Sequence, residues 1–197
     1  MRSFFNAENW LWKPLGALGD VVVLSLLWTV FSVPVVTLGP ASAALYDAAV
    51  HSIRRREDTV IARFLTAFRR EVKQGIVTTL ISLAAGALIF FAPLLVFNRQ
   101  DAWPFIFAAW WLLGFFLLCV LCWLFPALSR FTMGTGPLLS ASLRLAFGHI
   151  LRSVPMAALW AVTLWAGLRF IAPFFVCPAL AALLCSRLIE PIFKKYE

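Results

Sequence analysis

The sequence predicts an all-α fold: a polytopic membrane helix bundle of about five transmembrane helices, with two amphipathic interfacial helices on the cytoplasmic side. Of its 197 residues, 62% are hydrophobic and 13% are charged, whereas a soluble domain is typically about 45–50% apolar and about 25% charged. Apolar runs of membrane-spanning length recur along the chain, and positive charge collects between some of them. We therefore expect residues 1–197 to form a single integral membrane domain.

The spans follow from the lengths of the apolar runs, because a transmembrane helix needs about 20 apolar residues, within a range of roughly 17–25. The runs that approach this length are Val21–Leu38, Gly75–Phe97, Trp103–Phe125, Val154–Phe170 and Ala172–Ile189. Residues 1–15 precede them and contain Trp10 and Trp12. Tryptophan favours the headgroup level, so this segment is expected to lie on the outer surface. Residues 190–197 would form a cytoplasmic tail.

The first span carries signals of interruption. Pro34 lacks a backbone donor and predicts a kink, and Gly39-Pro40 predicts the end of the helix. Residues 41–53 then predict a short helix rich in small residues, with Ala44 and Ala48 one turn apart. Small side chains let helix backbones approach closely in membranes, so these positions indicate packing.

A basic amphipathic helix is predicted within residues 41–73, after the short helix. Val60, Phe64, Phe68 and Val72 recur at a spacing of four, which is typical of a helix with one apolar face. The cations around it, which we expect to contact anionic headgroups of the inner leaflet, are Arg54, Arg55, Arg56, Arg63, Arg69, Arg70 and Lys73. Such a helix would lie in the membrane interface, with about 1 kcal/mol of attraction for each basic residue. A nucleic-acid-binding arm would need a water-exposed basic domain, and the sequence contains none.

Residues 138–152 predict a second helix of this kind, because Leu139, Leu143, Phe147 and Leu151 also recur at a spacing of four. Each amphipathic segment follows one span and precedes another. This order suggests a parallel tandem repeat of span, interfacial helix and span. The simpler interpretation is that any two interfacial helices look alike.

The distribution of basic residues predicts the orientation. Segments 54–73, 130–152 and 187–195 hold thirteen of the seventeen Lys and Arg residues. Because Lys and Arg accumulate on the cytoplasmic side, these segments should lie inside the cell. The expected location is therefore a plasma membrane, with the N-terminus outside and the C-terminus in the cytoplasm.

Signs of catalysis are missing from the sequence. None of the predicted spans holds Asp, Glu, Lys, Arg or His in its central turns, which argues against a proton relay or an ion pump. The sequence has no P-loop, no His/Glu metal pair and no nucleophile elbow. Cys119 and Cys122 have the spacing of a redox or zinc pair, but inside an apolar helix they are expected to pack as small hydrophobic residues. We therefore expect no enzymatic activity, no cofactor and no metal.

The chain resembles the YesL-like family of bacterial integral membrane proteins, most strongly over residues 1–75. The residues that carry the resemblance are Phe5-Asn6 with Asn9, Leu18-Gly19-Asp20, Leu27-Trp28, the segment from Ser32 through Pro34-Val35-Val36-Thr37 to Gly39, Ala44-Leu45-Tyr46, Phe64, Phe68, Lys73-Gln74, and the ending Phe193 to Tyr196. The resemblance implies an accessory role in saccharide uptake or its regulation, because genes of this family tend to lie beside carbohydrate uptake systems. It implies no catalytic residues.

Two functions are the main candidates at this point, and lipid sensing through the basic helix is a third. The first is a non-enzymatic accessory or regulatory partner of an oligosaccharide uptake system, which would contact a transporter permease or a second copy of itself. The alternative is a small oligomeric facilitator or channel for an uncharged solute. Hydroxyl side chains that could line its path lie on the first two spans: Ser25, Thr29, Ser32, Thr78, Thr79 and Ser82.

Overall fold

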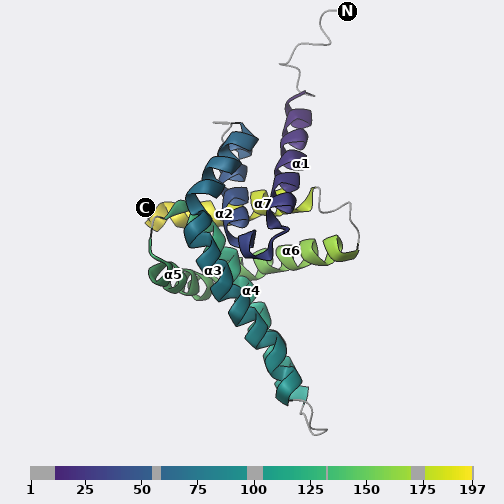
Figure 1. Ribbon diagram of the computed structural model, residues 1–197, viewed down its shortest axis with the longest axis vertical. Helices are drawn as coiled ribbons and strands as arrows, with labels where there is room; N and C mark the ends of the chain where they lie inside the picture. Colours follow the sequence, from purple (N-terminus) through teal and green to yellow (C-terminus); the bar gives the residue numbers. More distant parts are fainter. Residues whose placement is uncertain (1–11, 55–58, 97–103, 132, 170–175, 197) are drawn as a thin grey trace, which may run out of the picture.

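The computed structural model describes residues 12–54, 59–96, 104–131, 133–169 and 176–196 (Figure 1). These residues form seven α-helices, one 3-10 turn and one π-helical segment, and no strand occurs among them. In chain order the elements are α1 (Trp12–Ser32), η1 (Val35–Thr37), α2 (Leu38–Ala48), η2 (Ala49–Arg54), α3 (Val60–Val96), α4 (Pro104–Arg130), α5 (Thr135–Gly148), α6 (Ile150–Arg169) and α7 (Cys177–Tyr196). The predicted all-α class is confirmed for this part of the chain.

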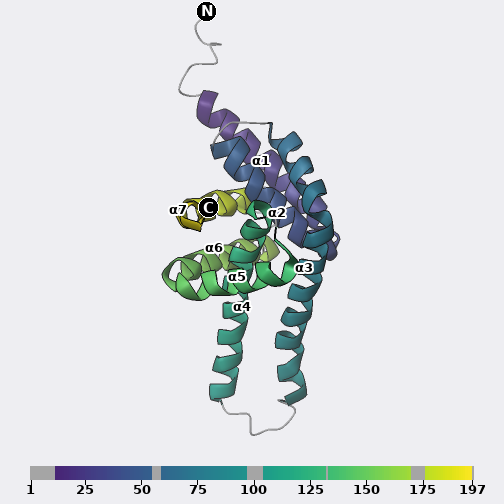
Figure 2. The same cartoon turned by 90° about the vertical axis from the view of Figure 1, so that its left-hand side faces the viewer.

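The helices run in two main directions. α3 and α4 form a long antiparallel hairpin, and its closed end extends well beyond the other helices (Figures 1 and 2). In both views α5, α6 and α7 lie across the direction of this hairpin, whereas α1 and α2 lie beside the first half of α3. The arrangement therefore differs from a bundle in which all long helices are parallel.

Three of the described helices are long and apolar enough to cross a membrane: Val60–Phe91, Ala108–Arg130 and Ile150–Gly167. The apolar part of α1, Gly16–Ser32, is shorter. Large apolar side chains on α4 and α6 are exposed, among them Trp111 at 79% and Trp165 at 67%, and exposed apolar surface of this extent is typical of contact with lipid. These features indicate a membrane protein, but the five predicted spans are not confirmed. Residues 1–11 and 170–175, which include part of the predicted outer segment and the start of the last span, lie outside the described residues.

The basic amphipathic segment and the second predicted span form one continuous helix, so the helix boundary predicted before Gly75 was wrong. α3 has 37 residues and is therefore about 55 Å long, whereas the hydrocarbon core of a bilayer is about 30 Å thick. The corresponding second segment, α5, is a separate helix, because the backbone of His149 (φ −127°, ψ 44°) departs from helical geometry before α6 begins. The two segments paired in the suggested tandem repeat thus join the next helix in different ways.

The turn after the first helix also differs from its prediction. α1 ends at Ser32, and the chain passes through Pro34 and a 3-10 turn before α2 begins at Leu38. Pro34 therefore lies between two separate helical elements, and not at a kink within one continuous helix. Gly39 and Pro40 lie in the first turn of α2 and do not end a helix. The N–H groups of a first turn have no acceptor within the helix, so proline, which lacks an N–H, is tolerated at these positions.

The short helix α2 lies in the protein interior. Its residues from Gly39 to Ala48 are all buried except Ser42, and four of its alanines are fully inaccessible. Leu45 of α2 packs in one buried apolar cluster with Leu24 of α1 and Phe64 of α3. Tyr46 of α2 belongs to a second cluster, which includes Trp123 of α4 and Phe193 of α7. The small residues of α2 thus permit close packing inside the molecule, as their pattern predicted.

Candidate functional site

The N-terminal end of α2 crosses α3 with backbone against backbone. The N–H of Gly39 donates to Thr79 Oγ1 at 2.9 Å, and Thr79 Oγ1 donates to the carbonyl of Gly75 at 2.6 Å. A Cβ added to Gly75 would lie 2.8 Å from Cδ and 2.9 Å from N of Pro40, and one added to Gly39 would overlap Thr79 Oγ1. Of the three residues predicted to shape the turn, Gly39 and Pro40 thus form this crossing, and Pro34 is exposed beside it.

A buried carboxylate joins α2 to the basic part of α3. Asp47 Oδ2 accepts a bond from Arg63 Nε at 2.5 Å, and Oδ1 accepts one from Arg63 Nη2 at 3.3 Å. His51 Nδ1 lies 3.3 Å from Asp47 Oδ1, at the π-helical segment that follows α2. The Asp47 side chain is 5% exposed and that of Arg63 is 27% exposed. Asp47 was not among the predicted site residues, although a single carboxylate in a helix of small residues indicates a buried partner.

Two other predicted lipid-contacting cations also bind groups of the protein. Arg70 Nε donates to Glu71 Oε1 at 2.6 Å, and Arg70 Nη2 donates to the carbonyl of Ser129 near the end of α4 at 2.9 Å. Arg54 Nη1 donates to the carbonyl of Ser186 on α7 at 3.4 Å. These side chains, like Arg63, connect helices of the protein.

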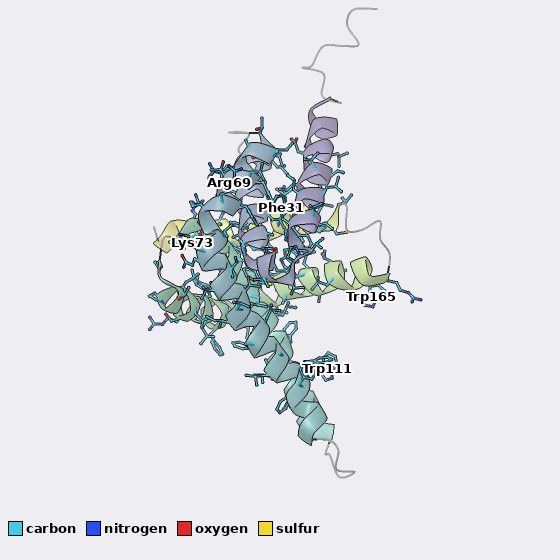
Figure 3. The ribbon with its side chains drawn as sticks, in the orientation of Figure 1. Phe31, Arg69, Lys73, Trp111 and Trp165 are labelled. Atoms are coloured by element: carbon cyan, nitrogen blue, oxygen red, sulfur yellow. The ribbon has the colours of Figure 1, made fainter. Side chains whose placement is uncertain are left out.

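The remaining members of the predicted basic surface are exposed or lie outside the described residues. Arg69 and Lys73 are exposed on α3, on its left-hand side in Figure 3. Arg55 and Arg56 lie outside the described residues. Contact of Arg69 and Lys73 with anionic headgroups stays a prediction.

Replacing both Arg69 and Lys73 with glutamine should weaken the stabilisation that anionic lipid gives to the protein. Each cation near a membrane surface contributes about 1 kcal/mol of attraction, and neither side chain is buried. The measurement is the difference in melting temperature between nanodiscs of anionic and zwitterionic lipid. The control is Thr66→Ala, which leaves every charge in place and changes an exposed position on the same helix. An undiminished difference in the double variant would contradict lipid contact by these residues.

A pocket of about 240 Å³ lies where α1, α2, α3, α4, α6 and α7 meet. Its lining is mainly apolar, and the rings of Trp28 and Trp160 form one side with centroids 6.1 Å apart. Trp28 Nε1 donates to Ser42 Oγ at 3.2 Å. Tyr46 also lines the pocket, and its buried hydroxyl has no hydrogen-bond partner. Burial raises the pKa of the Tyr46 phenol above its ordinary value, so the phenol stays neutral.

The lining of this pocket carries no charged side chain among the described residues. Its ionisable side chains are Tyr46, Cys122 and Cys185. Within the described ranges, no three His, Cys, Asp or Glu side chains are placed to hold a metal ion. Cys119 and Cys122 are free and buried in the apolar core, in agreement with their interpretation as packing residues.

Comparison with known proteins identifies one family match. Residues 21–92 match the model of a family described as "Protein of unknown function, DUF624". The match covers less than half of the chain. It runs from α1 through α2 to most of α3, and so includes the Gly39–Gly75 crossing and the Asp47–Arg63 pair. It overlaps the region in which the YesL-like resemblance is strongest and is consistent with that resemblance. No curated protein and no solved structure matches the chain.

Proposed function

We propose that this protein is a non-enzymatic integral protein of the plasma membrane and an accessory or regulatory partner of a carbohydrate uptake system. The link to carbohydrate uptake comes from the YesL-like resemblance. The membrane location is supported by the apolar helices, and an outside N-terminus with a cytoplasmic C-terminus is supported by the distribution of basic residues. The partner is a membrane protein such as a transporter permease, or a second copy of the chain.

The observation that carries this proposal is the exposed apolar corner between α5 and α6. Phe147, Ile150 and Leu151 are 59%, 51% and 89% exposed there. The exposed cations Arg144 and Arg152 flank them and belong to a segment that the charge distribution places inside the cell. The small-residue helix α2 is already buried against α3, so it is not free to receive a partner. The α5–α6 corner therefore offers the better contact surface.

Capture of the tagged protein from native membranes in mild detergent tests the proposal. We expect a transporter subunit or a second copy of the chain to be enriched with the wild type, and Leu151→Ser to lower that enrichment. Leu18→Ser is the matched control, because Leu18 is a 56% exposed leucine on α1, a helix that does not contact α5. Both substitutions affect exposed positions, where changes in stability usually stay within about 0.5 kcal/mol. Recovery of neither a transporter subunit nor a second copy would contradict the proposal.

The hydroxyl groups considered for a facilitator mostly bond to backbone carbonyls. Thr29 donates to Ser25, Thr78 to Gln74, Thr79 to Gly75 and Ser82 to Thr78, each one turn earlier on its own helix. Ser25 Oγ donates to the carbonyl of Val176 and accepts from the N–H of Ala179. A solute path needs a continuous lining of available polar groups, so these bonds favour the accessory role over the facilitator.

A further inference from the structure

A second pocket, of about 440 Å³, lies between the end of α4, α5 and the C-terminal turn of α7. This volume falls within the range of about 300–1,000 Å³ that small-molecule sites occupy. Most of the lining is apolar, and its large apolar side chains are Phe131, Met133, Leu138, Leu145 and Phe193. An apolar lining with a few polar groups is typical of sites that bind small organic ligands.

The deep part of this pocket is apolar and its mouth carries a cation. Leu138 and Phe193 are buried, whereas Met133 is 43% exposed. The Arg144 side chain also lines the pocket and is exposed. Because buried side chains form the floor and exposed ones the mouth, an occupant would place its apolar part inside and a polar group beside Arg144.

Arg144 differs from a neighbouring arginine in having no partner in the protein. Arg130 Nη1 donates to Glu190 Oε1 at 3.2 Å. In the part of the chain that the structure describes, no hydrogen bond or ion pair joins another group to the Arg144 guanidinium or to the His149 ring, which also lines the pocket. The described lining contains no Asp or Glu. The guanidinium therefore keeps its five N–H donors for an anion, and arginine binds carboxylate and phosphate groups through two parallel bonds.

This pocket is separate from the α5–α6 corner, because Phe147, Ile150 and Leu151 do not line it. In Figures 1 and 2, α7 lies on the side of α5 away from the closed end of the α3–α4 hairpin. Every lining residue falls within segments 130–152 and 187–195, which the charge distribution places in the cytoplasm. A cytoplasmic solute would therefore reach the pocket. This access rests on the orientation proposed above, whereas the pocket and its unpaired cation do not.

We propose that this pocket binds an amphipathic organic anion, a carboxylate or phosphate ester attached to an apolar body. The apolar body packs against Leu138 and Phe193, and Arg144 binds the anionic group at the mouth. The His149 ring offers a further N–H donor. A neutral sugar suits the site less well, because the apolar lining could not replace its hydrogen bonds to water. A cytoplasmic solute and an anionic phospholipid share the required chemistry.

Photolabelling in nanodiscs of zwitterionic lipid tests the proposal. The soluble probe is a benzophenone carboxylate, and its neutral match is the corresponding carboxamide. We expect the carboxylate to label pocket residues such as Met133, Leu138 or Phe193 about fivefold more strongly than the carboxamide does, as mapped by mass spectrometry. Labelling of the pocket to the same extent by both probes would overturn the assignment of an anion. Nanodiscs expose both faces of the membrane, so the result is independent of orientation and of any protein partner.

A second pair of probes distinguishes the source of the anion. An anionic phospholipid with a benzophenone at the end of one acyl chain is compared with a zwitterionic phospholipid that carries the same chain. Pocket labelling by the soluble carboxylate alone would identify a cytoplasmic solute, and labelling by the anionic phospholipid alone would identify membrane lipid. Labelling by both would show that the site accepts either source. Absence of pocket labelling by both anionic probes would overturn the proposal.

Arg144→Gln tests the partner assigned to the anionic group. It should lower labelling by the anionic probe about fivefold, to the level of the neutral probe, and should leave neutral labelling unchanged. Arg144→Lys should retain part of the difference, because it keeps the charge but not the planar fork. Arg187→Gln is the matched control, since Arg187 is exposed on α7 and does not line the pocket. No loss in Arg144→Gln, or an equal loss in Arg187→Gln, would overturn the role given to Arg144.

Variants that fill the pocket should abolish labelling by every probe. Ala141→Phe places a ring at a half-buried lining position, and Ser140→Phe does so at an exposed one. The second variant keeps the test decisive if the first does not fold. Leu143→Phe is the control, because Leu143 is 43% exposed on the same helix and does not line the pocket. Undiminished pocket labelling in a folded filled variant would contradict the assignment.

Discussion

Replacing Gly75 with alanine is expected to destabilise the protein by about 3 kcal/mol, because the new methyl group would overpack a backbone crossing. The added Cβ would lie within 3 Å of three atoms of Pro40, one of which is its backbone nitrogen. Neither α2 nor α3 can move aside without breaking the bonds among Gly39, Thr79 and Gly75. The measurement is the free energy of unfolding in detergent or lipid, together with the melting temperature.

Gly86→Ala is the matched control on the same helix. The nearest atom to its added Cβ, Leu117 Cδ2, lies at 3.9 Å, which is ordinary contact. Alanine is favoured over glycine in a helix by about 1 kcal/mol, so this variant should be neutral or more stable. If Gly75→Ala and Gly86→Ala had equal effects, the close crossing of α2 and α3 would not be a feature of the folded protein.

Replacing Asp47 with asparagine is expected to cost about 3 kcal/mol of stability. Breaking a buried ion pair by changing one partner typically costs about 3–5 kcal/mol, and the partial exposure of Arg63 places this case near the lower end. Asparagine keeps the size of the side chain but removes the charge that faces Arg63 and His51. Unfolding measured in the same lipid or detergent as the wild type gives the change in free energy.

Asp20→Asn provides the comparison, because Asp20 is exposed on α1 and its change should alter stability by less than about 0.5 kcal/mol. The double variant Asp47→Asn with Arg63→Gln should lose less unfolding free energy than the sum of the losses in the two single variants, because both changes remove the same interaction. A cost for Asp47→Asn no larger than that for Asp20→Asn would show that the pair contributes little to the fold.

Several features were predictable because each depends on a short stretch of residues. The apolar runs Gly75–Phe97 and Trp103–Phe125 were identified by hydropathy alone. Their described residues, 75–96 and 104–125, lie on α3 and α4. The helical character of residues 60–73 followed from their spacing of apolar residues. The second predicted amphipathic helix, 138–152, was only partly right, because α5 ends at Gly148 and Leu151 lies on α6. The small-residue pattern around Ala44 correctly indicated close packing, although not which helix would pack against it.

Other features could not be predicted because they depend on contacts between distant residues. Glycine usually favours the end of a helix, but Gly75 lies within α3 because its lack of a side chain lets Pro40 approach. Proline usually ends a helix, but Pro40 lies in the first turn of α2, because the helix break at Pro34 and the 3-10 turn come before it. Arg63 belonged to the predicted lipid surface by its position on the helix and is instead bonded to Asp47.

The sequence by itself determined that this is an apolar, helical membrane protein with most of its positive charge on one set of connecting segments. Transfer of a side chain from water to lipid depends mainly on the residue and its near neighbours, so such preferences can be read along the chain. Only the tertiary structure decided which cations are exposed, which glycines are required and where an apolar pocket forms. Those outcomes depend on pairs such as Arg63 with Asp47, 16 residues apart, and Gly39 with Thr79, 40 residues apart, and they exist only when the helices are packed.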